Sequence, residues 1–163
     1  MSHTVAVDSV VNGERVHREI PVRMTLAEFL RLDLGLTGTK VSCDLQVCGV
    51  CTVLVDDAPV SACTYLAASI HDRSVLTVEG LADGEQLHPL QQAFIDSFGL
   101  QCGFCTPGFL LAAKVLLDED PDPSFAQVQD HLEGNICRCT GYRPIIEAVL
   151  AAGQRMREEA VDG

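Results

Sequence analysis

Four of the eight cysteines lie close together in the first half of the chain, with the spacing C-x4-C-x2-C-x11-C: Cys43, Cys48, Cys51 and Cys63. C-x4-C-x2-C is a spacing with which a loop holds a [2Fe–2S] cluster. Such a loop wraps the cluster, and its backbone N–H groups face the negatively charged sulfurs. Gly49 has no Cβ that would block this approach. The spacing therefore predicts a [2Fe–2S] site, closed by Cys63.

Zinc and disulfides are the alternatives for these four cysteines. The pair Cys48-x2-Cys51 alone is a common zinc half-site, but a zinc knuckle pairs two close hairpins, and Cys43 would then have no role. The N-terminus shows no basic segment followed by an apolar run, so a secretory signal is not expected. We therefore expect a cytoplasmic protein, in which disulfides rarely persist.

The other four cysteines form two pairs in the second half of the chain: Cys102, Cys105, Cys137 and Cys139. C-x2-C with a distant C-x-C can make a four-thiolate site. Each pair comes just before an expected helix, where free N–H groups and the backbone dipole favour anionic sulfur. Spacing alone does not distinguish zinc from iron here. Two four-thiolate sites use all eight cysteines and leave none as a nucleophile.

Charge and length exclude several classes of partner. The chain has 163 residues, 11 Lys plus Arg against 23 Asp plus Glu, and a net charge of −12. Nucleic acid and anionic membrane surfaces need a basic face, so neither is an expected partner. No apolar run approaches the roughly 20 residues of a membrane-spanning helix. No arrangement of side chains for nucleophilic catalysis or phosphate binding is present, so no catalytic residue is expected.

The elements that must position the first four cysteines are mostly strands. Residues 3–20 alternate around the turn pair Asn12-Gly13, which predicts a β-hairpin. Thr25 and Glu28 fit a capping box that begins a helix over 26–34. A loop over 38–51 carries three of the cysteines, and strands are expected over 51–56, 59–63 and 74–79.

The second half shows helical periodicity. Helices are expected over 90–98 and from Thr106, as N-cap with Pro107 at N1, to about residue 117. Ser124 and Gln127 fit a second capping box that begins another helix. A last helix is expected from Pro144 to about residue 156, followed by a fraying tail. We therefore predict an α+β chain of two small domains, 1–80 and 81–163, with four cysteines in each.

At these residues the sequence resembles a known family, the small iron–sulfur subunit of the molybdenum hydroxylases, which includes xanthine dehydrogenase and the bacterial aerobic carbon monoxide dehydrogenases. The matching segments are LGLTGTK (34–40), CDLQVCGVCTV (43–53), QCGFCTPG (101–108) and GNICRCTGYRPI (134–145). In the last two segments the letters between the cysteines match as well.

The resemblance implies an N-terminal β-grasp, ferredoxin-like domain and a C-terminal four-helix domain, each with one [2Fe–2S] cluster. Electrons would pass from a molybdenum–pterin cofactor in a large subunit to FAD in a medium subunit, within a heterotrimer or a dimer of heterotrimers. It places Cys43, Cys48, Cys51 and Cys63 at the FAD-side cluster and Cys102, Cys105, Cys137 and Cys139 at the molybdenum-side cluster. Gln101 and Cys139 match positions that contact the pterin.

Two residues depart from the family pattern, which usually has glycine at the positions of Ser42 and Gln46. A polar Gln46 near a sulfur would raise the potential of the first cluster. Two other functions fit the cysteines: a free-standing ferredoxin without obligate partners, and a zinc-stabilised interaction module without redox activity. As an oxidoreductase subunit, the chain is not expected to turn over substrate alone.

Overall fold

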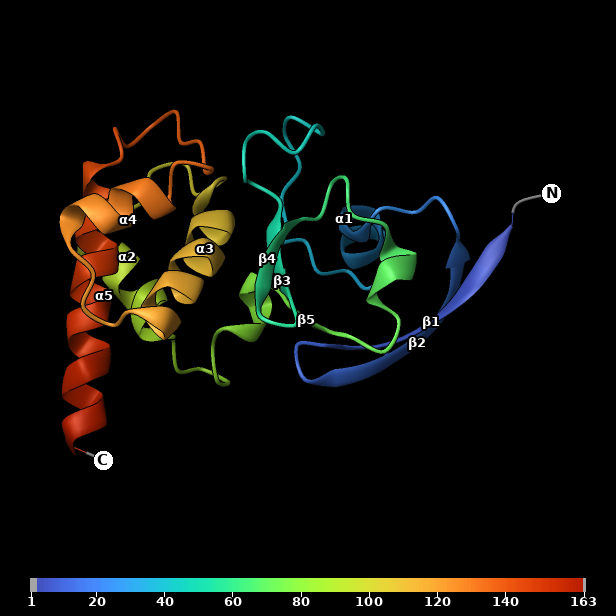
Figure 1. Cartoon of the computed structure of the whole chain (residues 1–163), viewed down its shortest axis with the longest axis horizontal. Helices are drawn as coiled ribbons and strands as arrows, with labels where there is room; N and C mark the ends of the chain where they lie inside the picture. Colours follow the sequence, from blue (N-terminus) through green and yellow to red (C-terminus); the bar gives the residue numbers. More distant parts are fainter. Residues whose placement is uncertain (1–2, 163) are drawn as a thin grey trace.

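The computed structural model describes residues 3–162, with side chains to residue 160, and places two halves side by side. A β-sheet half and a helical half lie at opposite ends of the molecule, and the cysteine-bearing loops lie along its upper side in Figure 1. The expected α+β class, with a strand-rich half followed by a helical half, is confirmed.

The first half is a five-stranded mixed sheet in the order β2-β1-β5-β3-β4. Its strands are β1 (Thr4–Val11), β2 (Glu14–Pro21), β3 (Thr52–Val55), β4 (Ala58–Ser61) and β5 (Ser74–Leu76). β1 pairs with β2 antiparallel through the predicted Asn12-Gly13 turn, and with β5 in parallel. β3 pairs antiparallel with both β4 and β5.

A short helical segment covers the sheet, as the capping-box residues predict. Thr25 caps α1 (Leu26–Glu28) through the reciprocal bonds with Glu28. The chain then widens into a π-helical turn, η1 (Phe29–Asp33), so the helical stretch expected over 26–34 is present but is not one regular α-helix. The first core joins this segment to the strands and to η2 (Ala67–Ile70); among its buried residues are Val7, Phe29, Val53 and Ile70.

Four helices build the second half: α2 (Pro89–Asp96), α3 (Thr106–Glu119), α4 (Phe125–His131) and α5 (Arg143–Asp162). Ser124 caps α4 in a capping box with Gln127, as predicted. Thr106 is not the N-cap of α3; Cys105 takes that position, and Thr106 is the first helical residue. α2 has an N-cap that its sequence did not reveal, because the Nδ1 atom of His88 accepts a hydrogen bond from the Leu90 amide.

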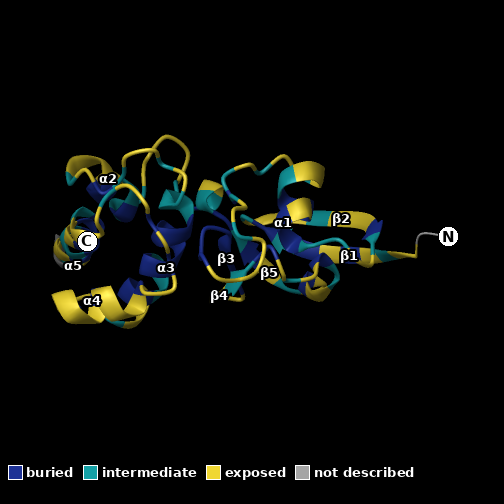
Figure 2. Cartoon of the chain, turned by 90° about the horizontal axis from the view of Figure 1, so that it is seen from above, coloured by how far each residue is buried: buried dark blue, intermediate teal, exposed yellow. Residues whose placement is uncertain are grey.

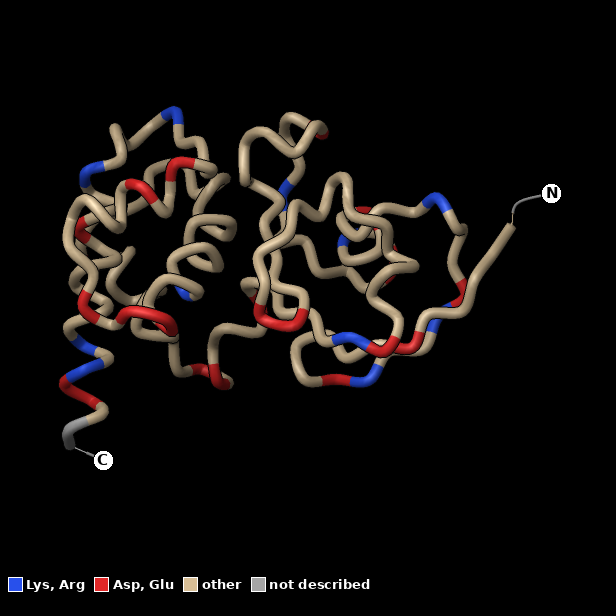
Figure 3. The backbone as a smooth tube through the Cα atoms, in the orientation of Figure 1, with Lys and Arg blue, Asp and Glu red and all other residues tan. Residues whose placement is uncertain are grey.

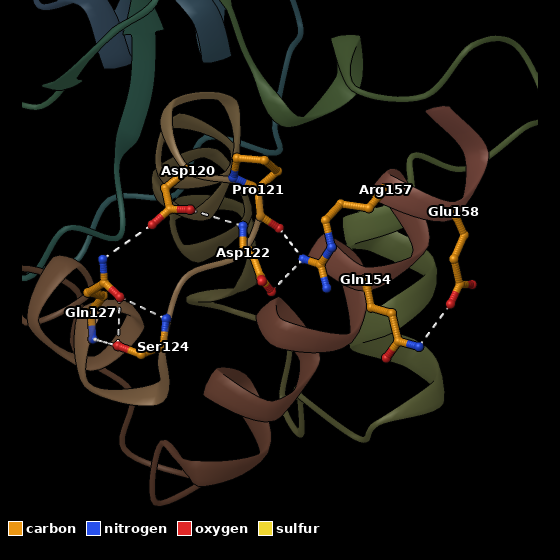
Figure 4. Close-up of polar contacts among 8 residues, drawn as sticks. All are labelled: Asp120, Pro121, Asp122, Ser124, Gln127, Gln154, Arg157 and Glu158. Atoms are coloured by element: carbon orange, nitrogen blue, oxygen red, sulfur yellow. Dashed lines mark hydrogen bonds and ion pairs between the residues drawn. The ribbon is translucent and has the colours of Figure 1, made fainter. Parts of the chain in front are cut away.

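The C-terminal helix is longer than predicted. We expected it to end near residue 156, yet α5 continues to Asp162. Arg157 stabilises this extension, because its guanidinium donates to the Pro121 carbonyl and lies 2.9 Å from the Asp122 carboxylate (Figure 4). Gln154 also donates to Glu158 one turn along, which supports the same stretch of helix.

The two halves share a packed interface rather than a linker. α3 packs against β3, β4 and the short η3 segment (Val78–Gly80). Leu54 of β3 belongs to the helical core, and Figure 2 shows buried residues on both sides where α3 faces β3. No helix among residues 3–162 is long and apolar enough to cross a membrane.

Candidate metal centres

The first four cysteines lie in the loop before β3 and directly after β4. Cys48, Cys51 and Cys63 are buried, and Cys43 is half-buried. Their thiols lie in two pairs within hydrogen-bonding reach, Cys43 with Cys48 and Cys51 with Cys63. The structure thus brings Cys43 close to Cys48 and Cys51 close to Cys63, all four selected by the C-x4-C-x2-C-x11-C spacing.

Backbone N–H groups turn inward onto the first of these sulfurs. The amides of Leu45 and Val47 each donate to the Cys43 Sγ atom at 3.4 Å. These bonds, with a further one from the Cys48 amide, lower the pKa of Cys43 to about 6. Burial, by contrast, raises the pKa of Cys51 to about 12. The loop therefore stabilises a thiolate at its outer end, whereas burial disfavours a thiolate at Cys51.

Ser42 and Gln46, which stand where the family usually has glycine, differ in backbone conformation. Gln46 has φ of 58°, in the left-handed region, whereas Ser42 does not. The Gln46 Oε1 atom accepts a hydrogen bond from the Thr64 hydroxyl at 3.0 Å, which joins the loop to the residue after Cys63. Among the described residues this side chain makes no bond to a sulfur, so the structure gives no direct contact through which it would raise the cluster potential.

The second set of cysteines lies at the starts of α3 and α5. Cys137 is buried, Cys105 is half-buried, and Cys102 and Cys139 are exposed. The Sγ atoms of Cys102 and Cys139 are 3.6 Å apart, and the thiols of Cys105 and Cys137 lie within hydrogen-bonding reach. Residues far apart in the sequence therefore form two thiol pairs here as well.

Hydrogen-bond donors also surround Cys137. The amides of Cys139 and Thr140 donate to its Sγ atom at 3.4 Å, and the Thr140 hydroxyl donates at 3.1 Å. Burial works to raise the pKa of Cys137, but these bonds outweigh it and the pKa is lowered. At Cys105 burial outweighs the one backbone hydrogen bond that lowers the pKa, and the pKa is raised to about 12.

Tyr142 stabilises the backbone of the loop that carries Cys137 and Cys139. Its hydroxyl accepts a hydrogen bond from the Cys137 amide at 3.1 Å, and its ring packs edge-on against Phe109 with centroids 6.4 Å apart. Sequence reasoning did not identify Thr140 or Tyr142 as partners of the cysteine. Their position directly after Cys139, in the segment Thr-Gly-Tyr, was the available signal.

Gln101 and Cys139, the two expected pterin contacts, are both exposed residues of this region. Gln101 directly precedes Cys102, whose sulfur lies beside that of Cys139. The five histidines lie apart from the thiol pairs in sequence. His71 accepts a hydrogen bond from the Asp8 amide, and two others contact helices. His88 caps α2, and His131 hydrogen-bonds the Ala112 carbonyl of α3.

The donor set fits two dinuclear iron–sulfur clusters. Each iron of a [2Fe–2S] cluster takes two protein sulfurs, and the chain offers two thiol pairs in each half. The backbone N–H groups that donate to the Cys43 and Cys137 sulfurs would offset part of the negative charge of four thiolates and two sulfides.

Comparison with known proteins also indicates [2Fe–2S] clusters. Residues 9–86 match the family described as "2Fe-2S iron-sulfur cluster binding domain", and residues 77–150 match the "[2Fe-2S] binding domain" family. The nicotine 6-hydroxylase small subunit of Paenarthrobacter nicotinovorans is 51% identical over 151 residues, covering 93% of this chain and 91% of that protein. The caffeine dehydrogenase subunit gamma of Pseudomonas sp. (strain CBB1) is 44% identical, covering 91% and 89%.

A solved structure agrees across almost the whole chain. A chain of quinoline 2-oxidoreductase from Pseudomonas putida 86 superposes with a TM-score of 0.92 at 43% sequence identity, covering 95% of this chain and 97% of that chain. Both halves and their relative placement are therefore shared with that protein.

Proposed function

We propose that this chain, which belongs to the family of small iron–sulfur subunits of molybdenum hydroxylases, carries electrons between two partner subunits through one [2Fe–2S] cluster in each of its halves. The observation that carries the proposal is the set of four thiol pairs, two in each half, at loops that meet across the interface. Each cluster, when bound, accepts and returns one electron.

We assign the ligands by these pairs. In the first half, Cys43 with Cys48 and Cys51 with Cys63 would each hold one iron; in the second half, the corresponding pairs are Cys102 with Cys139 and Cys105 with Cys137. Around the ligands, N–H donors to Cys43 and Cys137 offset negative charge. We further place the domain boundary between residues 80 and 81, after η3 and before the helical half.

The two sites face different partners in this proposal. Exposed Gln101 and Cys139 would contact the pterin of a large molybdenum subunit, and the apolar rim of the first loop would dock on a medium FAD subunit. Leu45 and Val47 of that rim are 73% and 62% exposed. In the sequence, Asp44 is the one charged residue within the C-x4-C-x2-C segment, and Arg138 is the one within the C-x-C segment. Figure 3 shows few charges along these loops. Low charge favours burial against a subunit.

The order of transfer follows from this placement. Substrate oxidation in the large subunit releases two electrons, and the chain passes them singly from the second half to the first, and on to flavin. The substrate is selected by the large subunit. A cytoplasmic location, where thiols stay reduced until iron is inserted, suits eight ligand cysteines.

Ligand variants test the assignment. Cys51→Ser removes a buried ligand from the first half and Cys105→Ser a half-buried ligand from the second, and each variant serves as the control for the other. Each purified complex should keep about two of four irons per chain and lose one of two EPR signals, a different one in each variant. The assignment fails if either variant retains both signals, or if both variants lose the same one.

Co-purification separates a subunit from a free-standing ferredoxin. Expression with its neighbouring subunits and a tag on this chain should recover a larger and a medium chain, with molybdenum and FAD. Anaerobic substrate should then reduce both clusters. A tagged chain that elutes as a monomer free of partners, yet carries both clusters, would support the ferredoxin instead.

A further inference from the structure

We propose that Asn135 is a positioning residue that sets the separation of the two clusters, by fastening the first cysteine loop to the second. The inference rests on the proposed function, since it concerns transfer between the two sites. It begins from a buried polar side chain that contacts the opposite half of the molecule.

Asn135 lies at the centre of the contact between the loops. Its side chain is buried, with 7% of the residue exposed, and its Nδ2 atom donates to the Gly49 carbonyl at 3.0 Å. The next amide, that of Ile136, donates to the Cys48 carbonyl at 2.9 Å. Two consecutive residues before the ligand Cys137 are thus bonded to the ligand Cys48 and its neighbour.

Glycines make this approach possible. A Cβ on Gly49 would lie 2.5 Å from the Gly134 carbonyl oxygen and 2.8 Å from the Asn135 carboxamide. A Cβ on Gly108, in the first turn of α3, would lie 2.3 Å from the Gly49 carbonyl oxygen. The two loops and the helix therefore approach so closely that neither Gly49 nor Gly108 leaves room for a Cβ.

The Gly49 carbonyl receives donors from both halves. Within the first half it accepts from the Thr52 hydroxyl at 2.7 Å and the Thr52 amide at 3.2 Å. Asn135 supplies the donor from the second half. Loss of the Thr52 hydroxyl would loosen the first loop alone, whereas loss of Asn135 would loosen the contact between the halves.

This contact controls electron transfer through distance. The bonded route between the two ligands passes from the Cys48 backbone through its carbonyl to the Ile136 amide and on to Cys137. Asn135 is bonded to the carbonyl of the next residue, Gly49, and so keeps the Cys48 carbonyl in place opposite the Ile136 amide. Without Asn135 the Ile136 bond would open more often, and the clusters would sit farther apart on average.

The test compares Asn135→Leu with the matched variant Thr52→Val in the iron-loaded complex. Leu keeps the branching and the number of non-hydrogen atoms of Asn, is larger, and removes the donor; Val keeps the shape of Thr and removes a donor to the same oxygen. Loss of a buried hydrogen bond costs about 1–3 kcal/mol, which corresponds to about 5- to 150-fold faster hydrogen exchange of the Ile136 amide. We expect this in Asn135→Leu, with a weaker EPR splitting between the two reduced clusters.

Iron and sulfide assays keep the two proposals distinct. If the parent chain binds no iron, the proposed function fails. If Asn135→Leu binds full iron yet shows unchanged Ile136 exchange and EPR splitting, the role of Asn135 is overturned. Equal changes in Thr52→Val would also overturn it, because they would trace to the loop rather than the interface. If Leu blocks cluster loading, Asn135→Ser, too short to reach Gly49, is judged by the same two readouts.

Discussion

Substitution of Gly108 by alanine tests the close approach of the two halves most sharply. In addition to the 2.3 Å contact with the Gly49 carbonyl oxygen, the new Cβ would lie 3.2 Å from both the Asn135 Nδ2 atom and the Val50 carbonyl oxygen. Two of these three atoms are backbone, so no side-chain rotation relieves the contact. The helix α3 and the first cysteine loop must move apart.

The expected cost follows from opposing terms. Alanine within a helix is favoured over glycine by about 1 kcal/mol. Overpacking costs about 1–3 kcal/mol, and loss of the Asn135–Gly49 and Ile136–Cys48 hydrogen bonds costs about 1 kcal/mol each. Because the losses exceed the helix gain, we expect Gly108→Ala to lower the free energy of unfolding by about 2–4 kcal/mol.

Urea unfolding of the iron-loaded chain, followed by far-UV circular dichroism, measures this change. Gly134→Ala is the matched control, because a Cβ there meets no atom within 4 Å and its φ is not positive. That variant should match the parent or gain about 0.4–1 kcal/mol from a less flexible unfolded chain. A Gly108→Ala chain as stable as Gly134→Ala would refute the close contact between α3 and the loop.

Four further substitutions test three local features. Burial lowers the pKa of His88, whose neutral Nδ1 caps α2. The cap stabilises the fold fully above the unfolded-state pKa of about 6.5, and this effect is lost as the pH falls through the lowered pKa of the folded state. When the pH is lowered from about 7.5 to about 5, the free energy of unfolding in urea should therefore decrease more in the parent than in His88→Asn. Arg157→Ala should cost about 1 kcal/mol or less and speed hydrogen exchange in the last turns of α5; unchanged exchange would contradict its bonds to the 121–122 segment. Gln46→Gly relieves left-handed strain but loses the bond from Thr64, so its stability should lie within about 1 kcal/mol of the parent, whereas Thr64→Val should be less stable than Gln46→Gly.

Local sequence signals predicted the elements that position the cysteines. Asn12-Gly13 forms the hairpin turn with positive φ at both residues, and Thr25 and Ser124 cap their helices through the side-chain bonds that their spacing suggests. These signals act within a few residues, so the sequence displays them directly. The C-x4-C-x2-C spacing is local in the same sense.

The missed features depend on residues distant in sequence. The length of α5 was underestimated because Arg157 finds its partners in the loop before α4. The reason for Gly49 was also incomplete: its missing Cβ makes room for Gly134 and Asn135 of the other half, besides leaving the loop backbone free. Contacts between residues far apart in the sequence follow from tertiary packing and leave no periodic pattern in the sequence.

The most direct test of the two-cluster relay is the metal content of the anaerobically purified protein. Iron, acid-labile sulfide and zinc are assayed together, and low-temperature EPR spectra are recorded after dithionite reduction. We expect about four iron and four sulfide per chain, with two distinct rhombic EPR signals. Zinc without labile sulfide, in a protein that dithionite leaves EPR-silent, would contradict an electron-transfer role for the eight cysteines.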